Sequence, residues 1–590
     1  MFASHLLSLG GGSDHLVGGG LDSKLFKTKS LEQLVGDVEH GGKALKRTLS
    51  AIDLTLLGIG AIIGTGIFVL TGTAAANQAG PAITMSYLAA GLACAFAALC
   101  YAEFASMIPI AGSAYTYAYA TLGELVAWMI GWDLILEYAV GSMTVAIGWS
   151  GYMQRLLAGF GIELPVAIAA APPIGFINLP AVIIVLLIMI LLVIGIRESA
   201  RFNAVMVAIK LAAVLFFLAA GVSYVEPANW QPYAPYGWPG IMTAAAVVFF
   251  AYIGFDAVST TAEEAKNPQR DLPIGIIASL VVCTILYLAV GAVLTGIVPV
   301  VEYRALEGAL PGVAMADPAE SVKFLNAPVA YALSLIGQDW AAGLVSAGAV
   351  AGITSVMLVM LMSQPRIFFA MSRDRLLPQG VSKVHPKFGT PYITTIITCV
   401  VVALVAGVTQ IQVVSEMTSI GTLFAFVVVC AAVLVLRVKR PEAKRPFRVP
   451  FGPVFPILGI LSCSYLMLSL PVLTWIRFLV WLDLGMVIYW FYGRTHSPLV
   501  NAAEAAARTP MQSLANFINT SGLLLMFNAA CMVILGYMTE FGITNETTAK
   551  WHEIGVTADQ ADTFGLQFLA VSVAVWAVGV GLTKASGEKG

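Results

Sequence analysis

Long apolar segments recur throughout this chain, and they constrain its fold more than any other feature. A helix needs about 20 consecutive apolar residues to cross the hydrocarbon of a bilayer. By that rule the sequence predicts fourteen transmembrane helices, near residues 53–74, 82–107, 115–155, 176–196, 200–224, 240–265, 273–298, 340–372, 391–408, 413–437, 454–473, 477–493, 515–538 and 564–583. Only 11% of the residues are charged, whereas soluble proteins carry about 25%. The predicted fold is therefore an all-α polytopic membrane protein, in which the third and eighth regions are long enough to include interfacial turns.

Lysine and arginine are distributed unevenly between alternate loops. With the N-terminus cytoplasmic, the inner segments hold 25 of the 31 basic residues and the outer segments hold 5, which leaves Lys210 within a span. The positive-inside rule then predicts a multi-pass protein of the cell membrane with both termini cytoplasmic. The net charge of −2 argues against nucleic acid as a partner, so membrane lipids are the expected surroundings. The sequence leaves open a monomer and a complex with a small single-span partner.

Four glycines interrupt the first predicted span, in the stretch GIGAIIGTGIF at residues 58–68. Glycine costs about 1 kcal/mol relative to alanine inside a helix, and irregular backbone within a membrane survives only where protein or a cavity covers it. Unwinding at Gly64, Thr65 and Gly66 would free their amide donors, which suit a carboxylate. It would also free carbonyls such as that of Ile62, which suit an ammonium. Close helix packing through small residues spaced by four is the alternative interpretation.

A second interruption lies in the sixth span. There Gly254 precedes Asp256, an acid within the apolar stretch VVFFAYIGFDAVSTT. Intramembrane acids are functional candidates by default, and paired interruptions in two halves of a chain are the best sequence indicator of a transporter's midplane site. Because the first and sixth spans each begin a block of five, the second block must be inverted. The sequence thus predicts a five-plus-five inverted-repeat core with discontinuous spans 1 and 6.

Lys210 lies about ten residues into the fifth span, or about 15 Å along a helix. Snorkelling to an interface is one interpretation. The other is that the amine carries a proton and that its ammonium bridges carbonyls of the broken first span. Asp133 and Glu137 lie four residues apart on one helix face, where they either support ion movement or cap backbone groups of a neighbouring helix. Histidines and cysteines are not spaced as metal ligands, so no metal site is predicted.

Seven motifs occur in order between about residues 45 and 495. They are GIGAIIGTGIF, YAEFASMIPIAGSAYTYAYATLGEL, GWDLILEYAVG, FFAYIGFDAVSTTAEEAKNPQRDLPIGI, QPRIFFAMSRDRLLP, EMTSIGTLFAF and RPFRVP. Together they resemble the cationic amino acid transporter family of the amino acid–polyamine–organocation superfamily, as a bacterial member in the inner membrane. The resemblance implies an inverted-repeat core, a substrate site between the two breaks, and fourteen spans.

The resemblance also implies roles for individual residues. It implies that the substrate carboxylate meets the first break, at Gly64, Thr65 and Gly66. It implies that the α-ammonium meets backbone carbonyls of Ile62, Phe250, Ala251 and Ile253. Lys210 falls where proton-coupled members replace a sodium site, and Glu137 matches a glutamate that the family needs for transport.

These features predict a secondary active transporter that takes up L-amino acids by proton symport and alternating access. Ile353 lies about where the family tunes side-chain size, on a wall (SAGAVAGITSVMLVML) that holds no acid. A desolvated cationic side chain would lack a partner there, so we expect neutral substrates such as alanine. The alternatives are an arginine or lysine transporter, and an exchanger in which Lys210 is a fixed structural charge. No catalytic set indicates an enzyme, and no cofactor is expected beyond the coupling proton.

The predicted spans divide the chain into four parts. These are a cytoplasmic tail at 1–48, a transport core of spans 1–10 at 49–438, spans 11–12 at 439–495, and spans 13–14 with the C-terminal tail at 496–590. The wider superfamily mostly has twelve spans, and the sequence does not indicate what the last two do.

Overall fold

The computed structural model describes residues 49–107, 113–194, 200–260, 265–304, 316–378, 380, 383–388 and 390–497, and four single residues, 518, 522, 525 and 528. In that part of the chain the regular secondary structure is helical, apart from one isolated parallel bridge between Leu49 and Ala265. The predicted all-α class is confirmed. The predicted tail and span 14 lie outside the described residues, as does span 13 except for those single residues.

Seven helical stretches within the described residues are long and apolar enough to cross a membrane. They are Gly66–Met107, Glu124–Gly159, Ala204–Tyr224, Pro268–Ile297, Asp339–Arg373, Ile411–Lys439 and Val472–Gly493. Shorter apolar helices lie between them: Ala51–Ile62, Leu179–Ile194, Gly237–Tyr252, Tyr392–Val408 and Val454–Leu468. These stretches fall within the first twelve predicted regions. The total of fourteen spans and the inverted repeat stay predictions.

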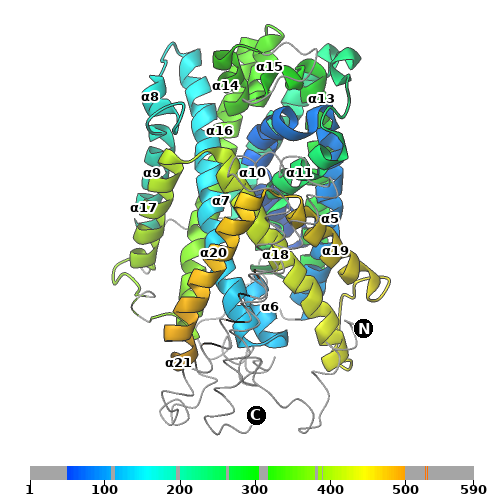
Figure 1. The fold of residues 1–590 in the computed structure, drawn as a ribbon, viewed down its shortest axis with the longest axis vertical. Helices are drawn as coiled ribbons and strands as arrows, with labels where there is room; N and C mark the ends of the chain where they lie inside the picture. The colour runs from blue at the N-terminus through cyan, green and yellow to red at the C-terminus, as the bar shows by residue number, and fades with distance from the viewer. Residues whose placement is uncertain are drawn as a thin grey trace.

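The helices stand side by side in an elongated bundle, with short helices at both ends (Figure 1). Helices α14 (Pro318–Asn326) and α15 (Pro328–Leu335) lie at one end, and α6 (Ser113–Thr121) and α21 (Arg494–His496) lie at the other. The charge bias predicts that the end with α6 and α21 is cytoplasmic. We call it the inner end.

The centre of the bundle consists of long helices in close contact. Helix α7 (Glu124–Gly159) packs along α16 (Asp339–Arg373) and α18 (Ile411–Lys439), while α5 (Ile83–Met107) packs along α13 (Pro268–Ile297). Small residues permit this proximity. A Cβ on Gly348 of α16, for example, would lie 2.6 Å from the Cβ of Ala213 on α10 (Ala200–Gly221).

The remaining helices cover this centre or link its members. They are α8 (Val166–Ala169), α9 (Leu179–Ile194), α17 (Tyr392–Val408), α19 (Val454–Leu468), α20 (Val472–Ile488) and the turns η3 (Gly80–Ala82), η4 (Val222–Tyr224), η5 (Pro227–Trp230), η8 (Val300–Tyr303) and η10 (Tyr489–Gly493). Large apolar side chains stand exposed on the outer faces of several helices, including Leu187, Ile285, Leu404 and Val480. Such faces are expected to contact lipid, because tails are as apolar as these side chains.

Interfacial turns were predicted in the third and eighth regions, and the structure contains one in only the first of these two. The third contains a turn, as predicted: α6 ends at Thr121, and α7 begins after Gly123, whose φ of 104° suits glycine. The eighth does not, so that prediction is wrong. Helix α16 continues without a break for 35 residues although it contains Pro365.

Candidate functional site

The first span is broken where the glycines predict. Helix α3 (Ala51–Ile62) ends in an extended residue, Ile63, with φ −73° and ψ 108°. Helical structure resumes at η1 (Gly66–Leu70) and continues through α4 (Thr71–Ala74) and η2 (Ala75–Ala79). The carbonyls at the end of α3 therefore meet the amide end of a second helical segment, which is the arrangement that can bind opposite charges side by side.

The sixth span is broken at its predicted midpoint too. Helix α11 (Gly237–Val248) passes into the 3₁₀ turn η6 (Phe249–Tyr252), and α12 (Ala257–Thr260) follows after a turn at Gly254. Gly254 has φ 123°, and a Cβ there would lie 2.8 Å from the carbonyl carbon of Ala61. Asp256 accepts a hydrogen bond from the Gly254 amide at 3.2 Å, so this acid stabilises the turn.

The two breaks touch each other. A Cβ on Gly66 would lie 2.3 Å from the Cβ of Ala251 and 2.4 Å from its Cα. The hydroxyl of Tyr287 on α13 lies 3.1 Å from the carbonyl oxygen of Ile62 and 2.5 Å from that of Ala251. A phenol has one proton to donate, so only one of these two carbonyls can receive it at a time. The predicted ammonium ligands Ile62 and Ala251 are thereby brought together at one point.

The other predicted carbonyl ligands lie in the same turn. The Phe250 oxygen accepts a hydrogen bond from the Ile253 amide at 3.1 Å. Both residues are buried, and a carbonyl oxygen retains a second lone pair after accepting one bond. The turn in span 6 therefore offers backbone carbonyl oxygens as hydrogen-bond acceptors beside its contact with span 1.

The amine of Lys210 lies at the end of α3 and not at an interface. Its Nζ donates to the carbonyl oxygens of Gly60 at 2.7 Å and Ile63 at 3.0 Å, and the residue is fully buried. Gly352 on α16 makes room for it, because a Cβ there would lie 3.0 Å from the Lys210 Cβ. Snorkelling is therefore wrong for this lysine. A cation at a helix C-terminus is stabilised by the helix dipole.

Thr65 carries a buried hydroxyl at the first break. Its Oγ1 has no hydrogen-bond partner within the described part of the chain. Gly148 on α7 faces it, and a Cβ there would lie 2.4 Å from the Thr65 Cγ2. A buried hydroxyl without a partner is unfavourable, and a carboxylate placed at the break would satisfy it.

The acids of α7 lie on the face that meets α18. Asp133 is fully buried against Gly421, where an added Cβ would lie 2.7 Å from its Oδ1, and Glu137 lies beside Thr422. Neither makes an ion pair in the described region. The structure thus gathers Glu137 and Asp133 on one side of the core without joining them to Lys210. Within the same described residues, no group of three side chains could hold a metal ion.

On α16, the predicted wall of the substrate site, a residue other than Ile353 contacts the first break. Ile353 is fully buried, but Val356 is the residue that meets the first break, with its Cγ2 3.1 Å from a Cβ added to Gly64. Gly352, directly before Ile353, packs on Lys210. Ile353 thus lies on the helix that packs against the first break, whereas the contact with Gly64 itself belongs to Val356, three residues later.

Sequence reasoning missed two tyrosines. Besides Tyr287, the Tyr87 hydroxyl on α5 donates to the Gly66 carbonyl oxygen at 3.1 Å. Both are fully buried. A tyrosine deep in an apolar stretch must find a partner for its hydroxyl, and that signal could have identified them.

Replacing Tyr287 with phenylalanine should weaken substrate binding about fivefold and leave the protein folded. The substitution removes the hydroxyl that donates to either the Ile62 or the Ala251 carbonyl oxygen, and one such hydrogen bond contributes about 1 kcal/mol. The substrate concentration at half-maximal uptake should rise more than the maximal rate falls. Tyr233→Phe is the matched control, because that hydroxyl contacts Thr84 at an exposed site. Equal effects of the two substitutions would contradict the prediction.

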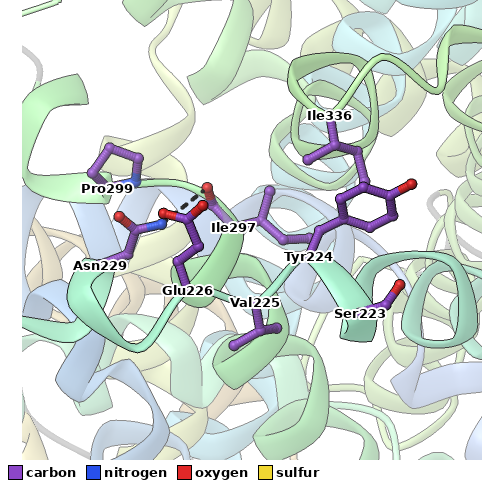
Figure 2. A pocket seen from close by; sticks show the side chains of 8 residues that line it. All are labelled: Ser223, Tyr224, Val225, Glu226, Asn229, Ile297, Pro299 and Ile336. Atoms are coloured by element: carbon purple, nitrogen blue, oxygen red, sulfur yellow. Dashed lines mark hydrogen bonds between the residues drawn. The ribbon is translucent and has the colours of Figure 1, made fainter.

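A surface pocket lies elsewhere, next to the ends of α10 and α13. Figure 2 shows its lining, in which the Asn229 amide donates to the carbonyl oxygen of Ile297 at 3.3 Å. The full lining is Ser223, Tyr224, Val225, Glu226, Asn229, Ile297, Pro299 and Ile336. None of these residues belongs to the two breaks, so the pocket is separate from the candidate site.

Similarity to known proteins covers the part of the chain that contains the two breaks. A sequence model described as amino acid permease matches residues 49–477, the stretch that contains both breaks and Lys210. The chain belongs to the amino acid permease family. The prediction of this transporter superfamily is confirmed, and the permease is a transporter and not an enzyme.

Relatives of the permease have several names. The methylthioribose transporter of Bacillus subtilis (strain 168) is 50% identical over 480 residues, which cover 81% of this chain and 99% of that protein. The branched-chain amino acid permease BcaP of the same organism is 51% identical over 484 residues, which cover 81% and 100%. The vacuolar cationic amino acid transporter 4 of Arabidopsis thaliana is 32% identical over 610 residues, which cover 82% and 98%.

Proposed function

We propose that the permease takes up neutral L-amino acids together with protons. The observation that carries this proposal is the buried ammonium of Lys210, hydrogen-bonded to the Gly60 and Ile63 carbonyls at the break in span 1. The Lys210 ammonium supplies a positive charge from the protein itself, and a buried amine can release and take up a proton. Amino acid transport itself agrees with the family of the permease.

The substrate backbone is proposed to bridge the two breaks. Its carboxylate meets the amides of the segment beginning at Gly66 and the buried hydroxyl of Thr65, which has no hydrogen-bond partner among the described residues. Its ammonium meets the carbonyls that Tyr287 now joins. Opposite charges at helix ends of opposite polarity fit an amino acid zwitterion.

A neutral, apolar side chain fits the surrounding wall best. Ile353, Val356 and Met357 on α16 are buried and carry no charge. Two relatives are named branched-chain amino acid permeases, from Bacillus subtilis (strain 168) and Lactococcus lactis subsp. cremoris (strain MG1363). We therefore extend the expected substrates from alanine to leucine, isoleucine and valine. Methylthioribose, named for another relative, has neither the carboxylate nor the ammonium that the two breaks would bind.

The coupling follows from charge. Protonation of Lys210 from outside would favour closure of α3 against α10, since the ammonium donates to the carbonyl of Gly60 in α3 and to that of Ile63 directly after it. The substrate then joins span 1 to span 6. Opening of the inner end releases both, and the neutral amine holds α3 less tightly, which allows the empty carrier to reset.

Competition for uptake into proteoliposomes tests the substrate class. Labelled leucine uptake should be reduced by alanine, valine and isoleucine, and unaffected by arginine, lysine and methylthioribose. Inhibition by arginine or lysine would support the cationic alternative, in which an acid such as Glu137 pairs with the side chain. Inhibition by methylthioribose would overturn the zwitterion site.

A pH gradient tests the coupling. Acid outside should drive accumulation of leucine, and each pH unit is worth about 1.4 kcal/mol, or about tenfold, for one proton. Exchange of internal for external leucine without any response to the gradient would support the exchanger alternative, in which Lys210 is a fixed charge.

Glu320→Gln should leave this pH dependence unchanged. Lys323 and Tyr331 donate to the Glu320 carboxylate at 2.7 and 3.0 Å and lower its pKa below the ordinary value. A group with a lowered pKa keeps its charge and its contacts above that pKa and loses them as the pH falls through it. At an external pH of about 5.5 Glu320 therefore remains ionised. A flattened pH profile of uptake in the variant would show that Glu320 on α14, and not the core, senses protons.

A further inference from the structure

The segment 437–454, which comprises the last residues of α18 and the loop that leads to the first residue of α19, is strongly basic; we call it the loop. Its residues 437–448 include six cations, Arg437, Lys439, Arg440, Lys444, Arg445 and Arg448, and one acid, Glu442. Helix α18 has 29 residues, about 43 Å at 1.5 Å per residue, which exceeds the hydrocarbon thickness of about 30 Å. The loop therefore lies at the membrane surface, at the end of α18 beside α6 (Figure 1), where the Lys439 Nζ is 3.5 Å from the Thr121 carbonyl oxygen.

A buried acid contacts both ends of this loop. Glu103, at the end of α5, is 2% exposed and accepts from the Arg437 Nε at 3.1 Å and from the Val449 amide at 2.8 Å. Arg437 also donates to the Gly452 carbonyl oxygen at 2.6 Å. Arg445 lies 3.5 Å from the same carboxylate. One acid thus meets two guanidinium groups, which leaves a net positive charge within the cluster.

Arg445 closes the loop upon itself. Its Nη1 donates to the Ala443 carbonyl oxygen and its Nη2 to that of Arg440, each at 2.8 Å. The positive-inside rule explains the presence of basic residues at this end, but it does not require an ordered loop. Here Arg437 and Arg445 are used inside the loop, while Lys444 and Arg448 stand exposed on its outside. The cations outside are therefore presented by a preformed scaffold.

Apolar side chains lie beside these cations. Phe451 is 75% exposed and has φ 57°, a left-handed backbone that phenylalanine seldom adopts. Its ring lies 5.2 Å from that of Phe455 on α19. Ile457 and Leu461 continue the exposed apolar face along α19. Positive charge next to an apolar strip matches a molecule with an anionic head and an acyl tail.

We propose that the loop 437–454 binds the phosphate headgroup of an anionic phospholipid, with the acyl chains along Phe451 and α19. This site is distinct from the proposed amino acid site. The bound lipid would hold the loop in place, and the loop contacts α5 through Glu103. The lipid would therefore stabilise the packing of α18 and α5 at the inner end of the permease. Zwitterionic lipids lack the net negative charge that the exposed cations would attract.

The test uses the purified full-length permease in detergent, titrated with phosphatidylglycerol or with phosphatidylcholine. Thermal melting measures stabilisation, and native mass spectrometry counts retained lipid. Phosphatidylglycerol should raise the melting temperature at lower concentration than phosphatidylcholine. The double variant K444Q/R448Q should shift the half-maximal phosphatidylglycerol concentration up about thirtyfold, at about fivefold per cation near the surface. These substitutions leave Glu103 and its partners intact.

K383Q/K387Q is the matched control, because it removes two exposed cations from the loop between α16 and α17. It should bind phosphatidylglycerol as the unmodified protein does. An equal loss in both variants would mean that general surface charge attracts the lipid, and would overturn the proposal. No difference between the two lipids would overturn it as well. Glycerol phosphate without acyl chains should not stabilise the protein; if it does so as well as the lipid, the site binds free phosphate esters and the lipid assignment is wrong.

Discussion

Lys210→Met should abolish proton-driven accumulation of leucine in proteoliposomes. Methionine has a similar length but no charge, so the carbonyl oxygens of Gly60 and Ile63 lose the ammonium that donates to them at 2.7 and 3.0 Å. With acid outside, the unmodified permease should accumulate leucine about tenfold for each pH unit if one proton moves with each substrate. The variant should only equilibrate leucine across the membrane. Normal accumulation by the variant would show that the proton is carried elsewhere.

Lys210→Arg separates charge from proton transfer. Arginine keeps its charge at every accessible pH, so this variant mimics a carrier that never releases its proton. It should retain exchange of internal for external leucine and lose net uptake. Lys323→Met on α14 is the matched control, since that lysine is exposed and lies outside the core. It should behave as the unmodified permease, and melting curves of all three variants establish whether each is folded.

Gly66→Ala should reduce leucine transport more than a hundredfold. The new methyl would lie 2.3 Å from the Cβ and 2.4 Å from the Cα of Ala251, and backbone cannot rotate away as a side chain can. The two broken spans must then separate, and a displacement of about 1 Å at a binding centre loses about a hundredfold in function. Overpacking of this kind also lowers stability by about 1–3 kcal/mol. Binding measured by thermal shift should fall together with uptake.

A graded series distinguishes this contact from general intolerance of glycine substitution. Gly64→Ala meets only the Val356 side chain, with 3.1 Å to its Cγ2, so its effect should be smaller and Val356→Ala should restore it. Gly343→Ala on α16 meets nothing within 4 Å and should be neutral or stabilise slightly. If Gly66→Ala binds leucine as tightly as the Gly343 variant does, the breaks do not form the substrate site.

The residues that could be identified from the local sequence were those that are energetically unfavourable in a membrane. The glycines of GIGAIIGTGIF and the pair Gly254 and Asp256 marked both breaks, because unwound backbone and an acid are unfavourable in hydrocarbon. Lys210 was conspicuous for the same reason. Tyr287 was missed although its buried hydroxyl had to find a partner, because the local sequence does not indicate in which segment that partner lies. The unbroken length of α16 was missed since length alone does not distinguish a tilted helix from a turn.

The sequence by itself determined that this chain is a helical membrane protein with two weakened spans and one lysine between them. Those features follow from the cost of placing backbone and charge in hydrocarbon, which depends on local composition. Only the tertiary structure decided that Lys210 reaches Gly60, 150 residues earlier, and that Gly66 rests on Ala251. It also decided that one tyrosine hydroxyl joins both breaks. These contacts depend on how distant helices pack, and no local pattern encodes which carbonyl a buried donor will meet.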